Sequence, residues 1–407
     1  RVGEKAEARR YLERLMHLDP PLEERLEALY WLSEVLEDPR EQRACLEEIL
    51  AHNFGDARAR RKLAILDGKL RPEDIVDPDQ MHIPAPADPQ TARTRAFTCP
   101  KCGARMVYTP DGQSLVCDYC STREQLSTVS ATPEDDFLIA MVTARAHSRP
   151  VTLQAVTCKG CGAAFILPPE ALAQTCPYCL TPYAIEQVEE RTLDAPDNIL
   201  PFILNADAAS NALRAWLAAD PPGRPVRVSR PAGIYLPVWL FNIGGQVSWK
   251  GIIYQNKQTI PVAGMRVINR TNLLVPASQH LPESLAPALH GFNLEALQPY
   301  DVRFLAGFPA ETFHITAADA SLEARRLALE LETREVQQTE IGQPVVDFSM
   351  ATGNMLVESY RLALLPLWLA FYEVNGRRYD AAINGQTGAV TGERPGKNLL
   401  ERISQWF

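Results

Sequence analysis

Four CxxC pairs constrain this chain more than any other feature of its sequence. They hold eight of the nine cysteines and repeat one pattern, C-x2-C-x14-C-x2-C, with every cysteine of the second copy 59 positions after its counterpart. A spacing repeated at all four positions indicates an internal duplication. The first copy has Cys99, Cys102, Cys117 and Cys120, and the second has Cys158, Cys161, Cys176 and Cys179.

Each copy has the pattern of a zinc ribbon. A CxxC turn directs two thiolates at one point, and two such turns joined by a hairpin make a closed tetrahedral S4 site, as in structural zinc. Pro100 and Pro177 fix φ just after a ligand, while Gly103 and Gly162 permit a left-handed turn just after a pair. We therefore predict two Zn²⁺ ions per chain, each held by its own four cysteines.

Short strands are expected between the cysteine pairs. Residues 105–108 and 114–116 flank the turn Pro110-Asp111-Gly112 in the first copy, and residues 163–167 form a strand in the second. His82 and His147 are the only histidines near the cysteines. They are expected to be bystanders, because eight cysteines already complete two sites.

Disulfides, redox chemistry and iron binding are the other uses that CxxC pairs have in proteins. Disulfides need an oxidising compartment, and the sequence shows no signal peptide. A redox CxxC works singly rather than in regular sets. Iron in a rubredoxin-like site has the same four ligands, so spacing alone does not distinguish it from zinc. Four thiolates leave no open position, which favours a structural metal worth about 10–16 kcal/mol of apparent binding energy.

Residues 1–67 are predicted to form a helical module. Leucine-rich apolar stripes are separated by breaks at Asp19-Pro20-Pro21, Asp38-Pro39 and Asn53-Phe54-Gly55. The stretch from Trp31 to Leu63 resembles a tetratricopeptide helix pair, which implies a peptide-docking module. Little more than one repeat is recognisable, so a plain small helical bundle stays open as the alternative.

This module carries the densest basic run of the chain and a ninth cysteine. The nearby Glu47, Glu48 and Asp56 favour a solvated helix face, with nucleic-acid contact as the alternative. Cys45 lies inside the third predicted helix and is expected to be a small core residue that binds no metal. The basic run consists of Arg58, Arg60, Arg61 and Lys62.

The middle of the chain divides at proline-rich and helical stretches. Five prolines in residues 68–97 predict a semi-extended linker without helix or sheet. Between the ribbons, Thr132 is a predicted N-cap with Pro133 at the first helical position. The predicted units are the linker at 68–97, the first ribbon at 98–130, a connecting helix at 131–150 and the second ribbon at 151–190.

The C-terminal part contains a second internal repeat. LPVWL at 236–240 matches LPLWL at 365–369 with an offset of 129. This predicts a duplicated helix plus antiparallel-sheet domain, with α+β units at 195–315 and 316–396 and a tail at 397–407. The Pro-x-Trp pairs are expected to be core and edge-strand residues rather than a ligand platform.

The predicted elements of these two units follow from local patterns. In the first unit, a helix at 207–219 precedes strands at 234–242 and 246–254, joined at Gly244-Gly245. In the second, a helix at 321–336 precedes strands at 362–373 and 378–383, joined at Asn375-Gly376, and a last short strand follows residue 388.

Composition limits the classes of function. A net charge of −9, with 46% hydrophobic and 22% charged residues, is ordinary for a globular protein and argues against nucleic-acid binding over the whole surface. The longest apolar run, at 362–372, has 11 residues and contains Pro366, so it is too short to span a bilayer. The sequence has no GxSxG, HExxH or Walker A motif, and we expect a protein that is not an enzyme.

The second ribbon and the segments after it resemble a group of bacterial zinc-ribbon proteins. The segments are ILPF at 199–202, YLPVWLF at 235–241, LLPLWLAFYE at 364–373 and INGQTGAVTGERP at 383–395. These proteins are labelled as transcription factor IIB-type or primosomal-protein-N′-like zinc ribbons, and the resemblance covers residues 155–396. It implies flotillin-like or phage-shock-protein-A-like partners in envelope stress and membrane helices after the GERP segment. The upstream ribbon and the helical N-terminus depart from the common form.

The sequence therefore predicts a multidomain α+β protein that acts as a non-enzymatic, zinc-binding adaptor or scaffold. We expect it in the cytoplasm, at the inner face of a membrane if a tether follows Phe407. The alternative is a nucleic-acid-binding zinc ribbon of replication or transcription. Only the first ribbon suits that role, because residues 91–130 carry a charge of +2 and residues 150–195 a charge of −3. Its candidate contacts are Arg93, Arg95, Lys101, Arg105 and Arg123, with Tyr108 and Tyr119 for stacking.

Overall fold

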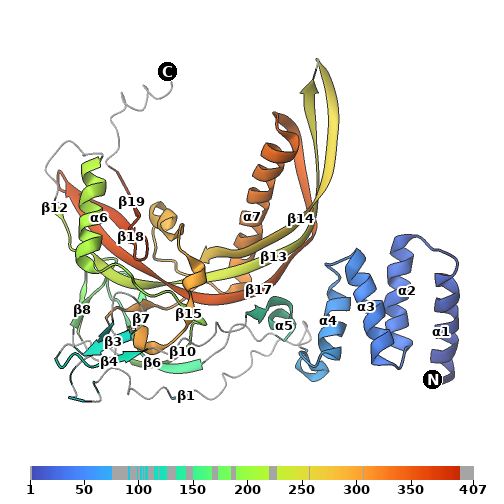
Figure 1. Cartoon of the computed structure of the whole chain (residues 1–407), viewed down its shortest axis with the longest axis horizontal. Helices are drawn as coiled ribbons and strands as arrows, with labels where there is room; N and C mark the ends of the chain where they lie inside the picture. Colours follow the sequence, from blue (N-terminus) through green and yellow to red (C-terminus); the bar gives the residue numbers. More distant parts are fainter. Residues whose placement is uncertain are drawn as a thin grey trace.

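The protein is a mixed α+β structure in which a helical module lies beside the middle of the long strands of an arched sheet (Figure 1). Two small cysteine ribbons lie near the lower left end of the sheet in this view. No helix in the described part of the chain is long and apolar enough to cross a membrane. The computed structural model describes residues 2–75, 90–91, 99, 101–102, 104, 106–108, 114–117, 119–125, 134–143, 150–166, 173–184, 189–219, 227–255, 257–305 and 307–394.

The helical module confirms the predicted helices and breaks. Its core contains Leu29, Leu46, Ile49 and Ala59, with Cys45 half-buried beside them. The carboxylates of Asp38 and Asp56 cap α3 and α4 by accepting from backbone amides of the first turn. The tetratricopeptide interpretation stays a prediction. The helices are α1 (Val2–Met16), α2 (Leu22–Val35), α3 (Pro39–His52) and α4 (Ala57–Leu66).

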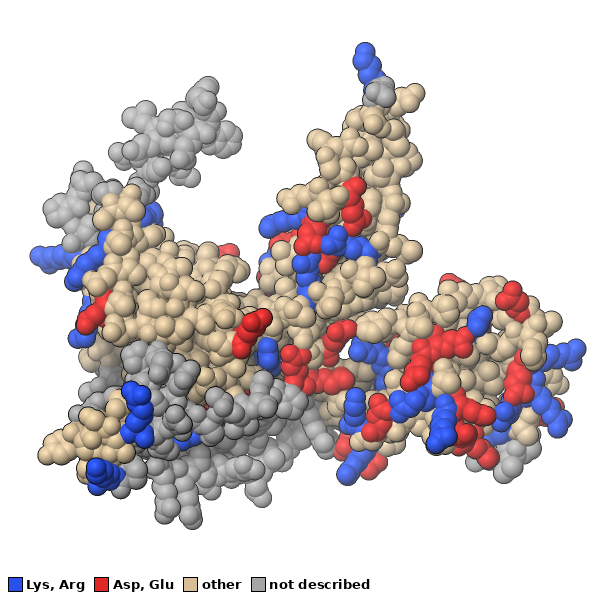
Figure 2. Space-filling model, in the orientation of Figure 1, with Lys and Arg blue, Asp and Glu red and all other residues tan. Residues whose placement is uncertain are grey.

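The basic run of α4 lies on an ion-paired helix face. Arg58 is 2.9 Å from a carboxylate oxygen of Glu27, and Lys62 is 2.6 Å from one of Glu34, both on α2. On the face shown in Figure 2, acidic and basic side chains are intermixed over this module. These contacts support the solvated helix face rather than a patch of one sign.

Two long antiparallel strands form the centre of the large sheet. They are β13 (Ala232–Gln255) and β17 (Val345–Val374). Leu236 pairs with Leu365, its own counterpart in the repeat at an offset of 129. The two LPxWL segments therefore lie antiparallel about a local two-fold axis.

The helices follow the same two-fold relation. Helix α6 (Ala206–Ala219) packs on β18 (Arg377–Asn384), whereas α7 (Ala317–Glu335) packs on β14 (Gln258–Pro276). The helix of each repeat thus covers the return strand of the other repeat. The duplication is present, and the strands of the predicted units at 195–315 and 316–396 join in one sheet.

The two tryptophans of the repeat stabilise this exchange. Both are buried, as predicted for core residues, but β13 and β17 are central strands, so the prediction of edge strands is wrong. The indole N–H of Trp239 donates to the carbonyl of Ile315, just before α7, at 2.7 Å, and that of Trp368 donates to Leu204, just before α6, at 3.2 Å. Each indole therefore anchors the start of the other repeat's helix.

The predicted turn at Gly244-Gly245 is wrong. Strand β13 runs through both glycines, and the chain reverses between Gln255 and Gln258. A Cβ on Gly245, where φ is +120°, would lie 1.9 Å from the carbonyl oxygen of Asn354 on β17. The glycine signal marks a close approach of two strands rather than a hairpin turn.

Three other elements differ from the prediction. Asp135 and Asp136 pair with β17 as β5 (Asp135–Asp136), so the connecting helix α5 (Phe137–Val142) starts later than predicted, with Asp136 as its N-cap. Thr132 and Pro133 lie outside the described residues. In the predicted linker, β1 (Gln90–Thr91) pairs with β6 (Pro150–Thr157). Strand β17 is longer than predicted because β13 supplies a partner along its N-terminal half.

Shorter elements complete the large sheet and the loops. Helix α7 continues into a π-helical segment at Val336–Ile341, and 3₁₀ turns lie at Pro72–Asp74, Glu283–Leu289, Leu294–Ala296 and Val302–Leu305. The remaining strands of this sheet are β7 (Ala164–Ile166), β10 (Glu189–Asp194), β11 (Asn198–Ile199), β12 (Arg227–Val228), β15 (Gln298–Pro299), β16 (Ala310–Glu311) and β19 (Val390–Gly392).

Replacement of Gly245 by alanine should destabilise the sheet strongly. The added Cβ meets backbone rather than a movable side chain, so we expect a loss of about 3 kcal/mol or more in the free energy of unfolding. Gly342→Ala is the matched control, since it also has positive φ but open space around it and should cost about 1 kcal/mol. Urea unfolding of both variants measures the difference, and equal losses would contradict the close approach.

Candidate metal centres

Two pairs of CxxC knuckles form the cysteine clusters. We call the first cluster ribbon 1 (Cys99, Cys102, Cys117 and Cys120) and the second ribbon 2 (Cys158, Cys161, Cys176 and Cys179). In every knuckle, the amide of the first cysteine donates to the carbonyl five residues later. These bonds are Cys99 to Ala104, Cys117 to Thr122, Cys158 to Ala163 and Cys176 to Thr181, at 2.7, 2.9, 2.8 and 3.0 Å.

The left-handed turn predicted at Gly162 is present, with φ of +80°. Ser121 and Leu180 adopt the same conformation after their own CxxC pairs, with φ of +54° and +65°. The knuckle therefore imposes this backbone even where the side chain disfavours it. The amides of Ser121, Gly162 and Leu180 donate to the carbonyl of the first cysteine of their pair at 2.8–3.0 Å, which helps to hold the turn.

The sulfur atoms lie at distances that suit one ion per cluster. Closest Sγ–Sγ distances are 3.5 and 3.5 Å in ribbon 1 and 3.4 and 3.6 Å in ribbon 2. Around tetrahedral zinc, with Zn–S near 2.3 Å, neighbouring sulfurs would lie about 3.8 Å apart. A disulfide needs about 2.05 Å, and all eight cysteines are free thiols here. Both clusters could therefore bind zinc, and iron stays open because it accepts the same ligands.

Two threonines that the sequence analysis missed contact the ligands. The hydroxyl of Thr122 is 3.0 Å from the Sγ of Cys120, and this contact, together with the backbone of Thr122 and the neighbouring thiols of Cys102 and Cys99, lowers the pKa of Cys120 to about 6. Burial raises the pKa of Cys179, but hydrogen bonds with the backbone and the hydroxyl of Thr181, which lies 3.2 Å from the Sγ, and with the neighbouring thiols outweigh burial and lower it to about 6. Thr122 and Thr181 are also 59 residues apart, so the repeat itself could have identified them.

The ribbons differ in their strands. Ribbon 1 has a small three-stranded sheet, and its first two strands match the predicted 105–108 and 114–116. In ribbon 2, β7 matches the predicted strand at 163–167. It pairs with β6 and β16 of the large sheet, whereas the other two strands of this ribbon pair with each other. The additional ribbon strands are β2 (Met106–Tyr108), β3 (Ser114–Cys117) and β4 (Arg123–Gln125) in ribbon 1, and β8 (Ala173–Thr175) and β9 (Pro182–Ala184) in ribbon 2.

Cysteines of both ribbons are buried in clusters that include residues of the large sheet. Strand β7 pairs with β16, and β16 pairs in turn with Tyr235 of β13. Cys158 and Cys176 are buried in a cluster with Leu200 and Leu236. The buried Cys99 and Cys117 belong to a second cluster that includes Tyr235. The predicted bystanders His82 and His147 lie outside the described residues.

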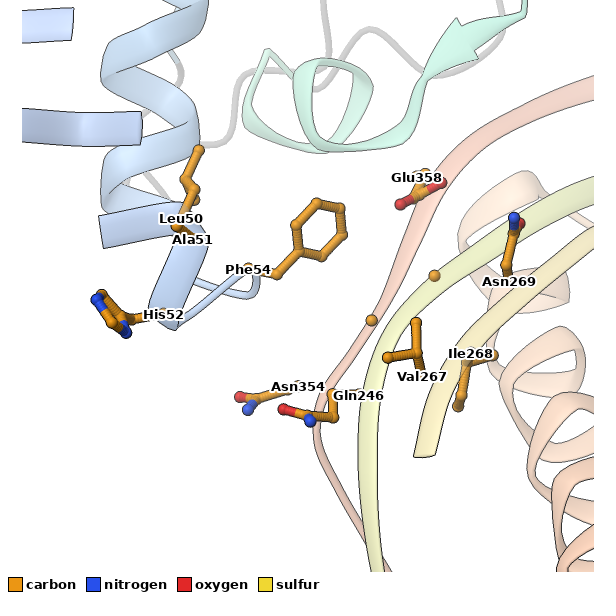
Figure 3. A pocket seen from close by; sticks show the side chains of 12 residues that line it. Leu50, Ala51, His52, Phe54, Gln246, Val267, Ile268, Asn269, Asn354 and Glu358 are labelled. Carbon is orange, nitrogen blue, oxygen red and sulfur yellow. The ribbon is translucent and has the colours of Figure 1, made fainter. Parts of the chain in front are cut away.

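A pocket of about 580 Å³ lies between the helical module and the sheet (Figure 3). Phe54 points into it from the loop between α3 and α4, and Val267, Asn269 and Glu358 line it from the strands. Gly55 on the same loop lies near Asn354 of β17. The pocket thus offers apolar and polar groups from two parts of the fold, as ligand and peptide sites do.

Comparison with known proteins gives one similarity of note. A Bacillus subtilis (strain 168) protein described as "Uncharacterized protein YdjG" is 26% identical over 239 residues, which cover 52% of this chain and 67% of that protein. No protein-family model matches the chain. No solved structure matches it either.

Removal of metal should destabilise the large sheet as well as the ribbons. The sequence alone predicts that the sheet survives chelation, but the burial of Cys158 and Cys176 beside Leu200 and Leu236 predicts a lower unfolding midpoint for both. Cys158→Ser should lose one ion and show the same destabilisation, whereas Cys45→Ser should lose none. Metal analysis and tryptophan fluorescence, to which the buried Trp239 and Trp368 contribute, measure these changes. An unchanged fluorescence transition in the metal-free chain would show that the ribbons are independent units.

Loss of a threonine hydroxyl should make its site more sensitive to acid. A thiol must lose its proton to bind metal, and the hydroxyl of Thr122 is the largest of the contacts that lower the pKa of Cys120. In Thr122→Val the thiol pKa rises, protons compete more strongly, and the midpoint of acid-induced zinc release should move to higher pH. The zinc affinity of ribbon 1 should fall about 10- to 100-fold. Thr122→Ser keeps a hydroxyl and should restore both values, as measured by chelator competition across pH.

Proposed function

We propose that this protein is a non-enzymatic, zinc-binding adaptor. In this proposal the metal ions stabilise the frame, while the helical module and the adjoining face of the sheet bind a protein partner. The observation that carries the proposal is the pocket between Phe54 and the strands, together with the exposed apolar residues that continue from it along β14.

The geometry of the cysteine clusters supports a structural role for the metal. Each cluster supplies four thiolates, which complete a tetrahedral zinc ion and leave no open position for water or substrate. Two sulfurs of each cluster are buried in the cores described above. Zinc bound in this way contributes to folding rather than to a reaction.

The outer face of β14 offers an apolar surface beside the pocket. Val267 lines the pocket and is 75% exposed, and Met265, two residues earlier on the same face, is 71% exposed. With Phe54, which is 41% exposed, they form an apolar surface, and a bound partner would remove this surface from water. Polar groups of Asn269 and Glu358 at its border could fix the register of a bound segment.

The resemblance to zinc-ribbon proteins suggests candidates for the partner and the location. Flotillin-like and phage-shock-protein-A-like proteins are the partners we propose to test first. We place the protein in the cytoplasm, at the inner face of the membrane.

Partner binding should depend on the pocket and not on the outer helix of the module. We expect Phe54→Ala and Val267→Asp each to weaken binding of the purified flotillin-like or phage-shock-protein-A-like protein at least 10-fold, since buried anchors carry most of the binding energy. Tyr11→Ala is the control, because Tyr11 on α1 is 67% exposed and does not line the pocket. Calorimetry of the full chain and its variants, with zinc content measured in parallel, tests the proposal. Equal affinities for all variants would refute it.

Nucleic-acid binding through ribbon 1 is the rival function, and it is favoured by Tyr119, which is 83% exposed. Lys101 and Arg123 of the same ribbon are exposed too. Binding of this kind must weaken steeply with salt, by about 0.9 in log K per phosphate contact for each unit of log salt. Salt-sensitive DNA or RNA binding that is lost in Lys101→Glu, with no affinity for the two candidate proteins, would favour the rival over the adaptor.

A further inference from the structure

Two histidines and a glutamate meet beside ribbon 2, outside both cysteine clusters. The Nδ1 of His280 lies 2.8 Å from Oε1 of Glu311, and the Nδ1 of His314 lies 3.8 Å from the same oxygen. One ligand atom from each of the three residues falls within 4.8 Å of the others. The sequence analysis missed this cluster because Glu311 and His314 are neighbours in the sequence but His280 comes from a segment 31 residues before Glu311.

Main-chain hydrogen bonds hold the three residues in place. Glu311 lies on β16 and pairs with Phe165 of β7. The amide of His314 donates to the carbonyl of Ala277 at 2.8 Å, and the amide of His280 donates to the hydroxyl of Ser278 at 3.0 Å. The cluster is therefore preformed where ribbon 2, the end of β14 and β16 meet.

We propose that His280, Glu311 and His314 form a third metal site, which takes a divalent ion of the zinc class. Around tetrahedral zinc, with bonds of 2.0–2.1 Å to nitrogen and oxygen, neighbouring ligand atoms lie about 3.3 Å apart. The two observed distances, 2.8 and 3.8 Å, bracket this value. A hydrogen bond to the carboxylate of Glu311 would explain the position of His280. It does not explain the position of His314, because 3.8 Å is too long for a hydrogen bond.

The charge of Glu311 gives a second, independent argument. Its side chain is fully buried, and its ion pairs among the described residues are with these two histidines. A carboxylate that is buried away from water needs a compensating cation close to it. A divalent ion at the three ligand atoms would compensate the charge and also engage His314.

The groups around Glu311 resemble the outer shell of a metal site. The hydroxyl of Tyr178 donates to Oε2 of Glu311, and that of Ser278 donates to Oε1 at 2.8 Å. Such bonds orient a ligating carboxylate. Tyr178 lies between Cys176 and Cys179, so the fold of ribbon 2 positions a residue that supports the proposed site.

The proposed site differs from the ribbons in having three protein ligands and access to solvent. His280 and His314 are 20% and 26% exposed. Three ligands of the His₂Glu type leave the fourth position of zinc for water or a small external ligand. The ribbons stabilise the fold, whereas this ion could bind a molecule from solution.

Zinc titration of the full chain tests the site. Starting from protein with both ribbons loaded, calorimetry and metal analysis should detect one further equivalent of Zn²⁺ in the wild type. His314→Ala and Glu311→Gln should abolish this equivalent and keep the ribbon ions. His290→Ala is the matched control, because His290 is an exposed histidine of the same region outside the cluster, and it should bind the full number.

Two further measurements keep the test decisive if a variant folds poorly. Tyr178→Phe keeps the ring but removes the hydroxyl, and should weaken the further equivalent about 10- to 100-fold. Co²⁺ added to wild-type protein with zinc-loaded ribbons should give ligand-field absorption without sulfur-to-metal charge transfer. No further equivalent in the wild type, its loss in His290→Ala, or sulfur charge transfer on binding would each overturn the proposal.

Discussion

The antiparallel pairing of β13 with β17 is the interaction on which the rest of the structure depends. Because Leu236 pairs with its own counterpart Leu365, the two halves of the repeat close on each other about a local two-fold axis. Neither half can bury its apolar strand alone, and each helix covers the return strand of the other half. The indoles of Trp239 and Trp368 also connect the two halves, because each donates a hydrogen bond to the residue just before the helix of the other half. The repeat is therefore an intertwined pair, with the clusters of α6 and α7 on the face of β13 that carries Tyr235 and Trp239 and a third cluster on the face that carries Leu236.

This sheet also explains why the ribbons are more than spacers. An isolated ribbon has too small a core to fold without metal. Here β16 connects β7 of ribbon 2 to β13, so the sheet and the ribbon share hydrogen bonds. The same junction places Tyr178 against Glu311. Metal binding, folding of the sheet and the arrangement of the histidine cluster are thus coupled at one place in the molecule.

The same sheet brings the helical module into a possible binding surface. The loop at Phe54 and Gly55 reaches β17 near Asn354, where Gly245 of β13 also approaches β17 closely. The close approach and the pocket therefore share residues, from segments that are about 190 and 300 residues apart from this loop in the sequence. A bulky residue at Gly245 would disturb both.

The sequence by itself determined the features that depend on local or repeated patterns. The metal ligands follow from the spacing of the cysteines, the helices of the N-terminal module from apolar periodicity and proline breaks, and the buried tryptophans from the LPxWL repeat. Tertiary structure decided the rest. The glycines at 244 and 245 have the local signature of a turn, but close approach of β17 extends the strand through them. Glu311 and His314 are three residues apart, but His280 lies 31 residues before Glu311 and becomes their neighbour only when β16 joins the sheet.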